Sequence, residues 1–323
     1  MDSKASFSGL ISAHRAFIMG ACIVVIMLFH NDFRVFGSYA WPVRCYGHWG
    51  VDVFLFISGF GLYHSLNRAH GAGLVQFYKR RLVRIMPAAV LAGCVLYACG
   101  VAGKLGLFGL NLWYMRTLLL LYLLAPLTYH LFSVRSPILV LLGHFVLGMA
   151  GVLISVPLLS GASFECQSTV SWTFARLPVF AVGMYVARMD FRLRQIFSPG
   201  YVLFACLCLF AALYFHDLRY ETRALSNYLH LFPYMLVAIA MPLLLGVLVF
   251  FIPANPGVVA HMAAWAGACS LELYLVHEAV FQRMAKISAA PGIKFLCAYA
   301  LSFAGAWVLK KLVDFLMRIK WSR

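Results

Sequence analysis

Several ionisable side chains lie within the long apolar runs of this sequence, and seven of them are the first candidates for chemistry. A charged or titratable group is costly inside a membrane segment, so each one requires a partner or a function. The seven residues are His30, Asp52, Arg116, His144, Arg176, Glu272 and His277.

His30 and Asp52 have the spacing of a catalytic pair. His30 lies near the end of the first apolar run and Asp52 near the start of the second, so two antiparallel helices would bring them to the same depth. A carboxylate beside an imidazole fixes the tautomer of the ring and suits it to general-base work. The pattern therefore predicts His30 as a base oriented by Asp52. The alternative is a structural polar pair that fixes helix packing.

Three polar residues of the ninth apolar run share one helix face. At 100° per residue, Ser270, Tyr274 and His277 fall within a sector of about 60°. A site role and an interhelical hydrogen-bonded stripe are equally good interpretations of this face. Glu272 points away from it. His144 has no companion in the sequence, and we expect a packed or interfacial histidine there.

A developing oxyanion in a group-transfer reaction requires hydrogen-bond donors. Arg116 and Arg176 are suited by charge and by their predicted depth, near the same membrane face as His30. Ser58 and Tyr274 are further candidates, and the sequence does not rank the four.

A basic segment at residues 79–84 (KRRLVR) precedes the third apolar run. On a helix, Arg80 and Arg84 share one face and Arg81 lies beside them. Guanidinium groups bind phosphate bidentately, which predicts a clamp for a phosphate-bearing cofactor. The alternative is an anchor for lipid head groups.

Composition decides the class of protein that carries these residues. The chain has 323 residues, 63 % of them hydrophobic and only 11 % charged, and its mean hydropathy is +0.88. These values exclude a soluble enzyme, a disordered chain and a disulfide-stapled secreted domain. The net charge of +16 is explained by basic residues at the cytoplasmic surface rather than by nucleic-acid binding. The nine cysteines lack the spacing of a zinc site, so no metal is expected.

The apolar runs predict an all-α polytopic membrane protein with about ten transmembrane helices in one domain, residues 1–323. With both termini cytoplasmic, the inner side collects about twice as many Lys and Arg residues as the outer side. The predicted segments are 16–33, 47–65, 86–103, 111–131, 137–158, 171–188, 200–216, 228–252, 262–282 and 291–310.

Five motifs in order resemble the acyltransferase-3 family of membrane O-acyltransferases. Each motif alone is weak, but the five in this order are specific. Two of them are residues 50–60 (GVDVFLFISGF) and 77–87 (FYKRRLVRIMP). The others are 112–114 (LWY) with Tyr122 and Pro126, 176–180 (RLPVF) with Gly183, and 270–277 (SLELYLVH). The resemblance covers about residues 15–280.

The resemblance implies transfer of an acyl group, commonly acetyl, from cytoplasmic acyl-CoA to a hydroxyl of a cell-surface glycan or its precursor. It also implies an essential histidine at His30, and a multi-pass protein of the plasma (cell inner) membrane, with lipid and a glycan or other hydroxyl acceptor as partners. The family's first span also carries an arginine eleven residues before that histidine, where this chain has Met19 and the nearest arginine is Arg15.

A polysaccharide or small-molecule exporter or flippase is the alternative function. Polar residues in the spans would then line a pathway, although no inverted repeat or matched pair of broken helices is evident. The sequence leaves open the acceptor, the acyl chain length, the oligomeric state and a pairing of Cys45 with Cys166.

The predicted topology places the loop at residues 217–224 outside the cell. A cysteine introduced at Ser226, in a background without other reactive thiols, should then react with a membrane-impermeant maleimide in intact cells. Labelling that requires lysed cells would contradict the ten-helix topology with cytoplasmic termini.

Overall fold

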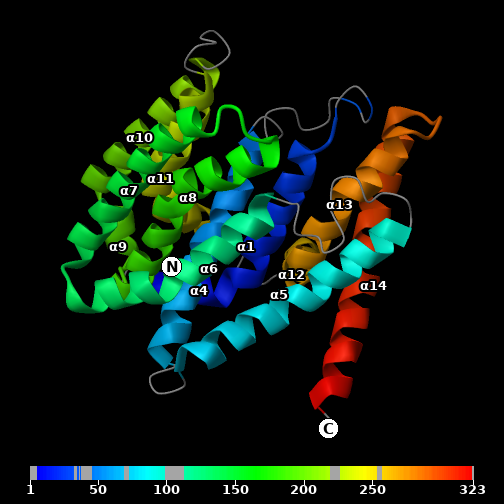
Figure 1. Ribbon diagram of the computed structural model, residues 1–323, viewed down its shortest axis with the longest axis horizontal. Helices are drawn as coiled ribbons and strands as arrows, with labels where there is room; N and C mark the ends of the chain where they lie inside the picture. The colour runs from blue at the N-terminus through cyan, green and yellow to red at the C-terminus, as the bar shows by residue number, and fades with distance from the viewer. Residues whose placement is uncertain are drawn as a thin grey trace. The chain divides into compact units, whose positions relative to one another are not determined.

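The computed structural model of the chain describes residues 6–32, 35, 37, 46–68, 73–98, 113–218, 226–252 and 257–321. The regular structure in these ranges is helical, with one isolated bridge between Ser6 and Arg192. The helices labelled in Figure 1 are α1 (Phe7–Phe29), α4 (Gly50–Arg68), α5 (Gly73–Ala98), α6 (Trp113–Val134), α7 (Pro137–Leu158), α8 (Phe164–Met189), α9 (Leu193–Ile196), α10 (Pro199–Leu218), α11 (Ser226–Phe250), α12 (Val258–Ala268), α13 (Ser270–Ala285) and α14 (Pro291–Trp321). A short 3₁₀ turn, η1 (Gly47–Trp49), directly precedes α4.

Eight helices of the described ranges are long and apolar enough to span a bilayer, which makes the chain a multi-pass membrane protein. They are α1, α5, α6, α7, α8, α10, α11 and α14. By the same length and composition, α12 and α13 would add a ninth span among the described residues if they form one segment, and these two helices are bent by 85° at their junction. α4 does not reach the hydropathy of the others, since Asp52, His64 and Asn67 interrupt its apolar residues. The count of ten and the cytoplasmic termini stay predictions.

Helix boundaries differ most from the sequence prediction at α5. The apolar run predicts a segment that begins at residue 86, but the helix begins at Gly73 and includes the basic segment. Lys and Arg are good helix formers, so the charged residues continue the helix beyond its apolar part. The basic segment is therefore helical, as the face argument for Arg80 and Arg84 requires.

The chain divides into two compact units, each with its own packing, and two of the divisions fall within α1 and α4. Unit 1 comprises Met1–Arg15, Asp52–Gly73 and Trp113–Asn255; unit 2 comprises Ala16–Val51, Leu74–Leu112 and Pro256–Arg323. The prediction of a single domain over 1–323 stays a prediction.

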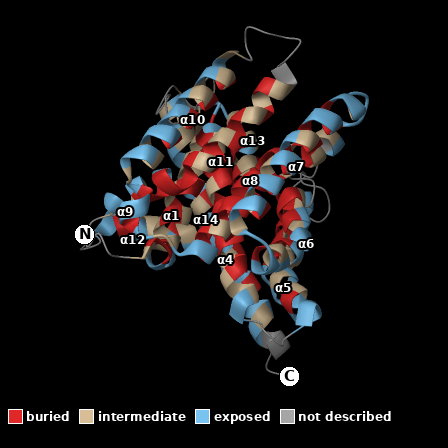
Figure 2. Ribbon diagram, turned by 90° about the vertical axis from the view of Figure 1, so that its left-hand side faces the viewer, coloured by how far each residue is buried: buried red, intermediate tan, exposed pale blue. Residues whose placement is uncertain are grey.

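Unit 1 is built around α8, which packs against α6, α7 and α11 and is buried over most of its length (Figure 2). α4 crosses α8 closely because both helices carry glycine at the crossing. A Cβ atom on Gly59 would lie 2.2 Å from the carbonyl oxygen of Phe180, and one on Gly183 would lie 2.2 Å from that of Phe56. The two backbones therefore touch, as small residues allow in membrane helices.

In unit 2, glycines likewise allow α1 and α12 to cross closely. A Cβ atom on Gly20 would lie 1.7 Å from the carbonyl oxygen of Ala263, and one on Gly267 would lie 1.8 Å from that of Ala16. The chain bends just beyond this crossing, at Cys269, and continues as α13. α13 then runs beside α14 (Figure 1). The crossing and the bend together set the direction of α13 within unit 2.

The α4–α8 crossing generates a stability prediction. Gly59→Ala should lower the thermal midpoint of the purified protein, because overpacking a tight contact costs about 1–3 kcal/mol. The matched control is Gly143→Ala in α7, where an added Cβ meets nothing within 4 Å. That variant should be neutral or slightly stabilising, since alanine replaces glycine inside a helix. Equal midpoints for the two variants would contradict the close crossing.

Candidate functional site

Two histidines meet within unit 2. His30 follows the last residue of α1, and His277 lies on α13 with 1 % of its surface exposed. The Nε2 atom of His277 is 3.2 Å from Nδ1 of His30, and the ring centroids are 5.0 Å apart. The structure thus brings together two of the residues that the sequence singled out separately.

Backbone carbonyls fix the tautomer of both rings. Nδ1 of His277 lies 2.9 Å from the carbonyl oxygen of Leu273 and 3.0 Å from that of Tyr274. A carbonyl oxygen only accepts, so this nitrogen carries the proton and Nε2 of His277 has a lone pair. Nδ1 of His30 therefore donates toward His277, and it also lies 3.0 Å from the carbonyl oxygen of Ile26. In neutral His30, Nε2 is left as the basic nitrogen.

A carboxylate faces that basic nitrogen. Oε1 of Glu278 lies 3.5 Å from Nε2 of His30, and the two side chains are 31 % and 25 % exposed. The negative charge stabilises His30 once Nε2 has accepted a proton. Glu278 was not among the candidates drawn from the sequence, although it falls within the predicted ninth segment. An acidic residue directly after a candidate histidine was the signal that could have found it.

Asp52 forms an ion pair that the sequence did not single out. Within unit 1, its Oδ1 atom lies 3.2 Å from Nε of Arg176, and both side chains are almost fully buried. The Arg176 guanidinium also lies 3.7 Å from the ring centroid of Tyr234 and 4.6 Å from that of Trp113. The pair is therefore a buried ion pair with aromatic neighbours. Because Asp52 and His30 belong to different units, an orienting role for Asp52 stays a prediction.

The remaining candidate donors are divided between the units. Tyr274 is buried in unit 2, with its ring centroid 5.8 Å from that of His277. Ser58 on α4 and Arg116 on α6 are half-buried in unit 1. Their predicted roles at an oxyanion stay predictions.

His144 is a packed histidine, as expected from its isolation in the sequence. It is buried in unit 1, with Nε2 3.1 Å from the hydroxyl of Thr128 and Nδ1 2.7 Å from the carbonyl oxygen of Val140. Both ring nitrogens thus have partners within the helix packing, and the prediction is confirmed.

The basic segment presents two of its arginines to solvent or lipid. Arg80 and Arg84 are exposed on α5, whereas Arg81 is half-buried with its guanidinium 5.6 Å from the ring centroid of Phe77. Arg84 and Lys310 also interact electrostatically with Glu272 of α13. The segment therefore combines exposed cations with a link to α13 and α14 inside unit 2.

Two other sequence predictions concern metals and disulfides. In the described ranges, no group of three or more His, Cys, Asp or Glu residues is placed to hold a metal ion. Cys166 is exposed and has no disulfide partner among the described residues. Its suggested partner Cys45 lies outside the described residues, so their pairing stays a prediction.

The Asp52–Arg176 pair generates a double-mutant prediction. Asp52→Asn leaves the Arg176 charge buried without a counter-charge, which should cost about 3–5 kcal/mol of stability. Combining Asp52→Leu with Arg176→Met removes both charges and should restore most of the lost stability. Thermal unfolding of the purified variants, with exposed Arg318→Gln as control, measures both effects. A double variant as unstable as Asp52→Asn would contradict the buried-pair account.

Comparison with known proteins agrees with the motifs. A family model described as an acyltransferase domain, that of the acyltransferase-3 family, matches residues 19–311. The match includes His30, the basic segment, Asp52, Arg176 and the whole of α13. No curated protein and no solved structure shows significant similarity to the chain. The family match covers most of the sequence, and the chain therefore belongs to the acyltransferase-3 family.

Proposed function

We propose that this protein transfers an acyl group, commonly acetyl, from cytoplasmic acyl-CoA to a hydroxyl of a cell-surface glycan or its precursor, in the plasma (cell inner) membrane. Family membership supports acyl transfer. The observation that carries the mechanism is the environment of His30. Its Nδ1–H is held by His277 and Ile26, and its Nε2 faces Glu278.

The proposed reaction is a direct transfer with His30 as general base. Nε2 of His30 takes the proton of the acceptor hydroxyl as that oxygen attacks the thioester carbonyl carbon. The tetrahedral intermediate then collapses, the carbon–sulfur bond breaks and the sulfur leaves as the CoA thiolate. His30 returns its proton to that sulfur, so the enzyme is unchanged at the end of the cycle.

Glu278 acts as a positioning residue in this scheme. Its carboxylate is close enough to stabilise the imidazolium that forms on His30. The 3.5 Å separation is longer than a direct hydrogen bond, so an acceptor hydroxyl can approach Nε2 without first displacing a tight ion pair.

The oxyanion requires a donor, and the four candidates differ in their surroundings. Tyr274 is the best placed of the four, because it lies beside His277 in the same unit as His30. Arg116 and Ser58 keep their candidate roles. Arg176 is the least suited, because Asp52 already opposes its charge and aromatic rings surround its guanidinium.

The donor is proposed to bind through its phosphates to the basic segment. Arg80 and Arg84 are exposed on one face of α5, and Arg81 lies beside them with its guanidinium over Phe77. Arginine suits this task because its charge persists and its planar group contacts two phosphate oxygens at once. A CoA held there would extend its pantetheine arm toward His30.

Neutralising the basic segment tests this assignment. Replacing Arg80, Arg81 and Arg84 together by glutamine should raise the apparent KM for acyl-CoA by at least tenfold, since each charge-assisted contact contributes roughly 1.5–3 kcal/mol. The KM for the acceptor should change much less. The control replaces three other exposed cations, Arg135, Lys311 and Arg318. An unchanged donor KM in a correctly inserted variant would leave the segment as a lipid anchor.

The general base is tested by His30→Ala and Glu278→Gln in purified protein supplied with acyl-CoA and acceptor. His30→Ala should lower transfer per folded molecule by about 10²–10⁴-fold while acyl-CoA still binds. Glu278→Gln should retain part of the rate and move the acidic limb of the pH–rate profile to lower pH, because a charge that favours protonated His30 is gone. The matched control is His261→Ala on exposed α12. Full specific activity in His30→Ala would rule out the mechanism.

A further inference from the structure

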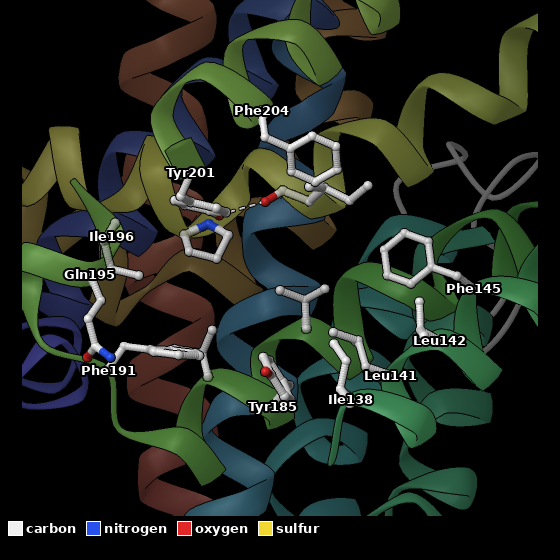
Figure 3. A pocket seen from close by; sticks show the side chains of 14 residues that line it. Ile138, Leu141, Leu142, Phe145, Tyr185, Phe191, Gln195, Ile196, Tyr201 and Phe204 are labelled. Atoms are coloured by element: carbon white, nitrogen blue, oxygen red, sulfur yellow. Dashed lines mark hydrogen bonds between the residues drawn. The ribbon is translucent and has the colours of Figure 1, made fainter. Parts of the chain in front are cut away.

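Unit 1 contains a cavity of about 540 Å³ that the proposed acyl transfer does not use. It lies between α7, α8, α10 and α11, with α9 at one end. Figure 3 shows Ile138, Leu141 and Leu142 of α7 on one side of it, facing Phe191 and Gln195 on the other. The volume is in the range of pockets that bind small molecules.

The walls of this cavity suit hydrocarbon. They are formed mainly by aliphatic and aromatic side chains, including Phe145 and Phe204. Two of the polar side chains in the lining already form hydrogen bonds with the backbone. The Tyr201 hydroxyl donates to the carbonyl oxygen of Ile239 at 2.7 Å, and the Gln195 side-chain oxygen accepts from the backbone N–H of Arg192 at 2.8 Å. An apolar chain that enters the cavity therefore does not leave these two polar groups without hydrogen-bond partners.

The cavity is accessible from the lipid-facing surface of unit 1. Ile138 and Leu142 on α7 are 48 % and 52 % exposed, and Phe204 on α10 is 52 % exposed. All three line the cavity, and both helices are candidate membrane spans. The exposed apolar face of a span contacts lipid tails, so a tail can pass between these residues.

Positive charge gathers at the α9 end of the same cavity. Arg188 in the last turn of α8 is exposed, as are Arg192 and Arg194 in the segment that joins α8 to α10. Leu193 and Ile196 of α9 are buried. The acidic residue of this segment, Asp190, accepts a hydrogen bond from the Ser6 hydroxyl at 2.5 Å. Exposed arginines at the end of membrane spans attract anionic head groups.

We propose that this cavity binds one acyl chain of an anionic phospholipid, with the lipid phosphate held against Arg192 and Arg194. The apolar walls take the chain, and the two arginines select the charge of the head group. The residues that line the cavity belong to unit 1, whereas the proposed acyl-transfer residues His30, His277 and Glu278 belong to unit 2.

Photocrosslinking in lipid nanodiscs tests the proposal. The probe is phosphatidylglycerol with a diazirine in one acyl chain, and the matched probe is phosphatidylcholine with the same chain. Peptide mapping should find phosphatidylglycerol labelling concentrated on residues 138–145 and 201–204, with competition by unlabelled phosphatidylglycerol. Equal labelling by the two probes would overturn the head-group selection. Labelling spread evenly over the exposed faces of α10 and α14 would overturn the site itself.

Two variants separate the chain from the head group. Leu142→Trp fills the exposed rim of the cavity and should lower labelling there, whereas Leu207→Trp, on an exposed α10 position outside the lining, should not. Arg192→Gln with Arg194→Gln should lower phosphatidylglycerol labelling about tenfold, to the phosphatidylcholine level, as expected for two arginines facing an anionic head group. Lys311→Gln with Arg318→Gln is its charge-matched control. Unchanged labelling in the arginine variant would overturn the proposal.

Discussion

The hydrogen bond between His277 and His30 is the interaction on which the proposed chemistry of unit 2 depends. A buried imidazole must satisfy both of its ring nitrogens, and His277 meets one of them with the carbonyl oxygens of its own helix. Nε2 of His277 then carries a lone pair and can only accept a hydrogen bond. Because its neighbour is Nδ1 of His30, that nitrogen must carry the proton of His30. The hydrogen bonding that buried His277 requires thus leaves Nε2 as the basic nitrogen of His30.

The helix packing of unit 2 supplies the geometry for that bond. The glycines at positions 20 and 267 let α1 and α12 approach until their backbones touch. The 85° bend at Cys269 then redirects the chain into α13, which carries His277 and Glu278. A straight α12–α13 helix would send these residues in another direction. A catalytic arrangement built on helices rather than loops is held more precisely.

The sequence predicted what depends on residue type and missed what depends on helix rotation. Apolar runs located the helices, and the cost of burying ionisable groups identified His30, Asp52, Arg176 and His277. Hydropathy does not show which side of a helix faces its neighbours when the helix is apolar all round. The pairing of Asp52 with Arg176 was therefore not predictable. The same holds for the approach of Glu278 to His30. The bend at Cys269 was also missed, because the apolar run continues through it.

The central claim is that Nε2 of His30 is the basic nitrogen, and nitrogen-15 NMR tests it most directly. Protein with labelled histidine in lipid bilayers, compared with His30→Gln to assign the signals, reports which ring nitrogen carries the proton at neutral pH. The account predicts a neutral His30 with its proton on Nδ1 and an unprotonated Nε2. A proton on Nε2 of neutral His30 would contradict it, because that nitrogen would then be unable to accept the acceptor's proton.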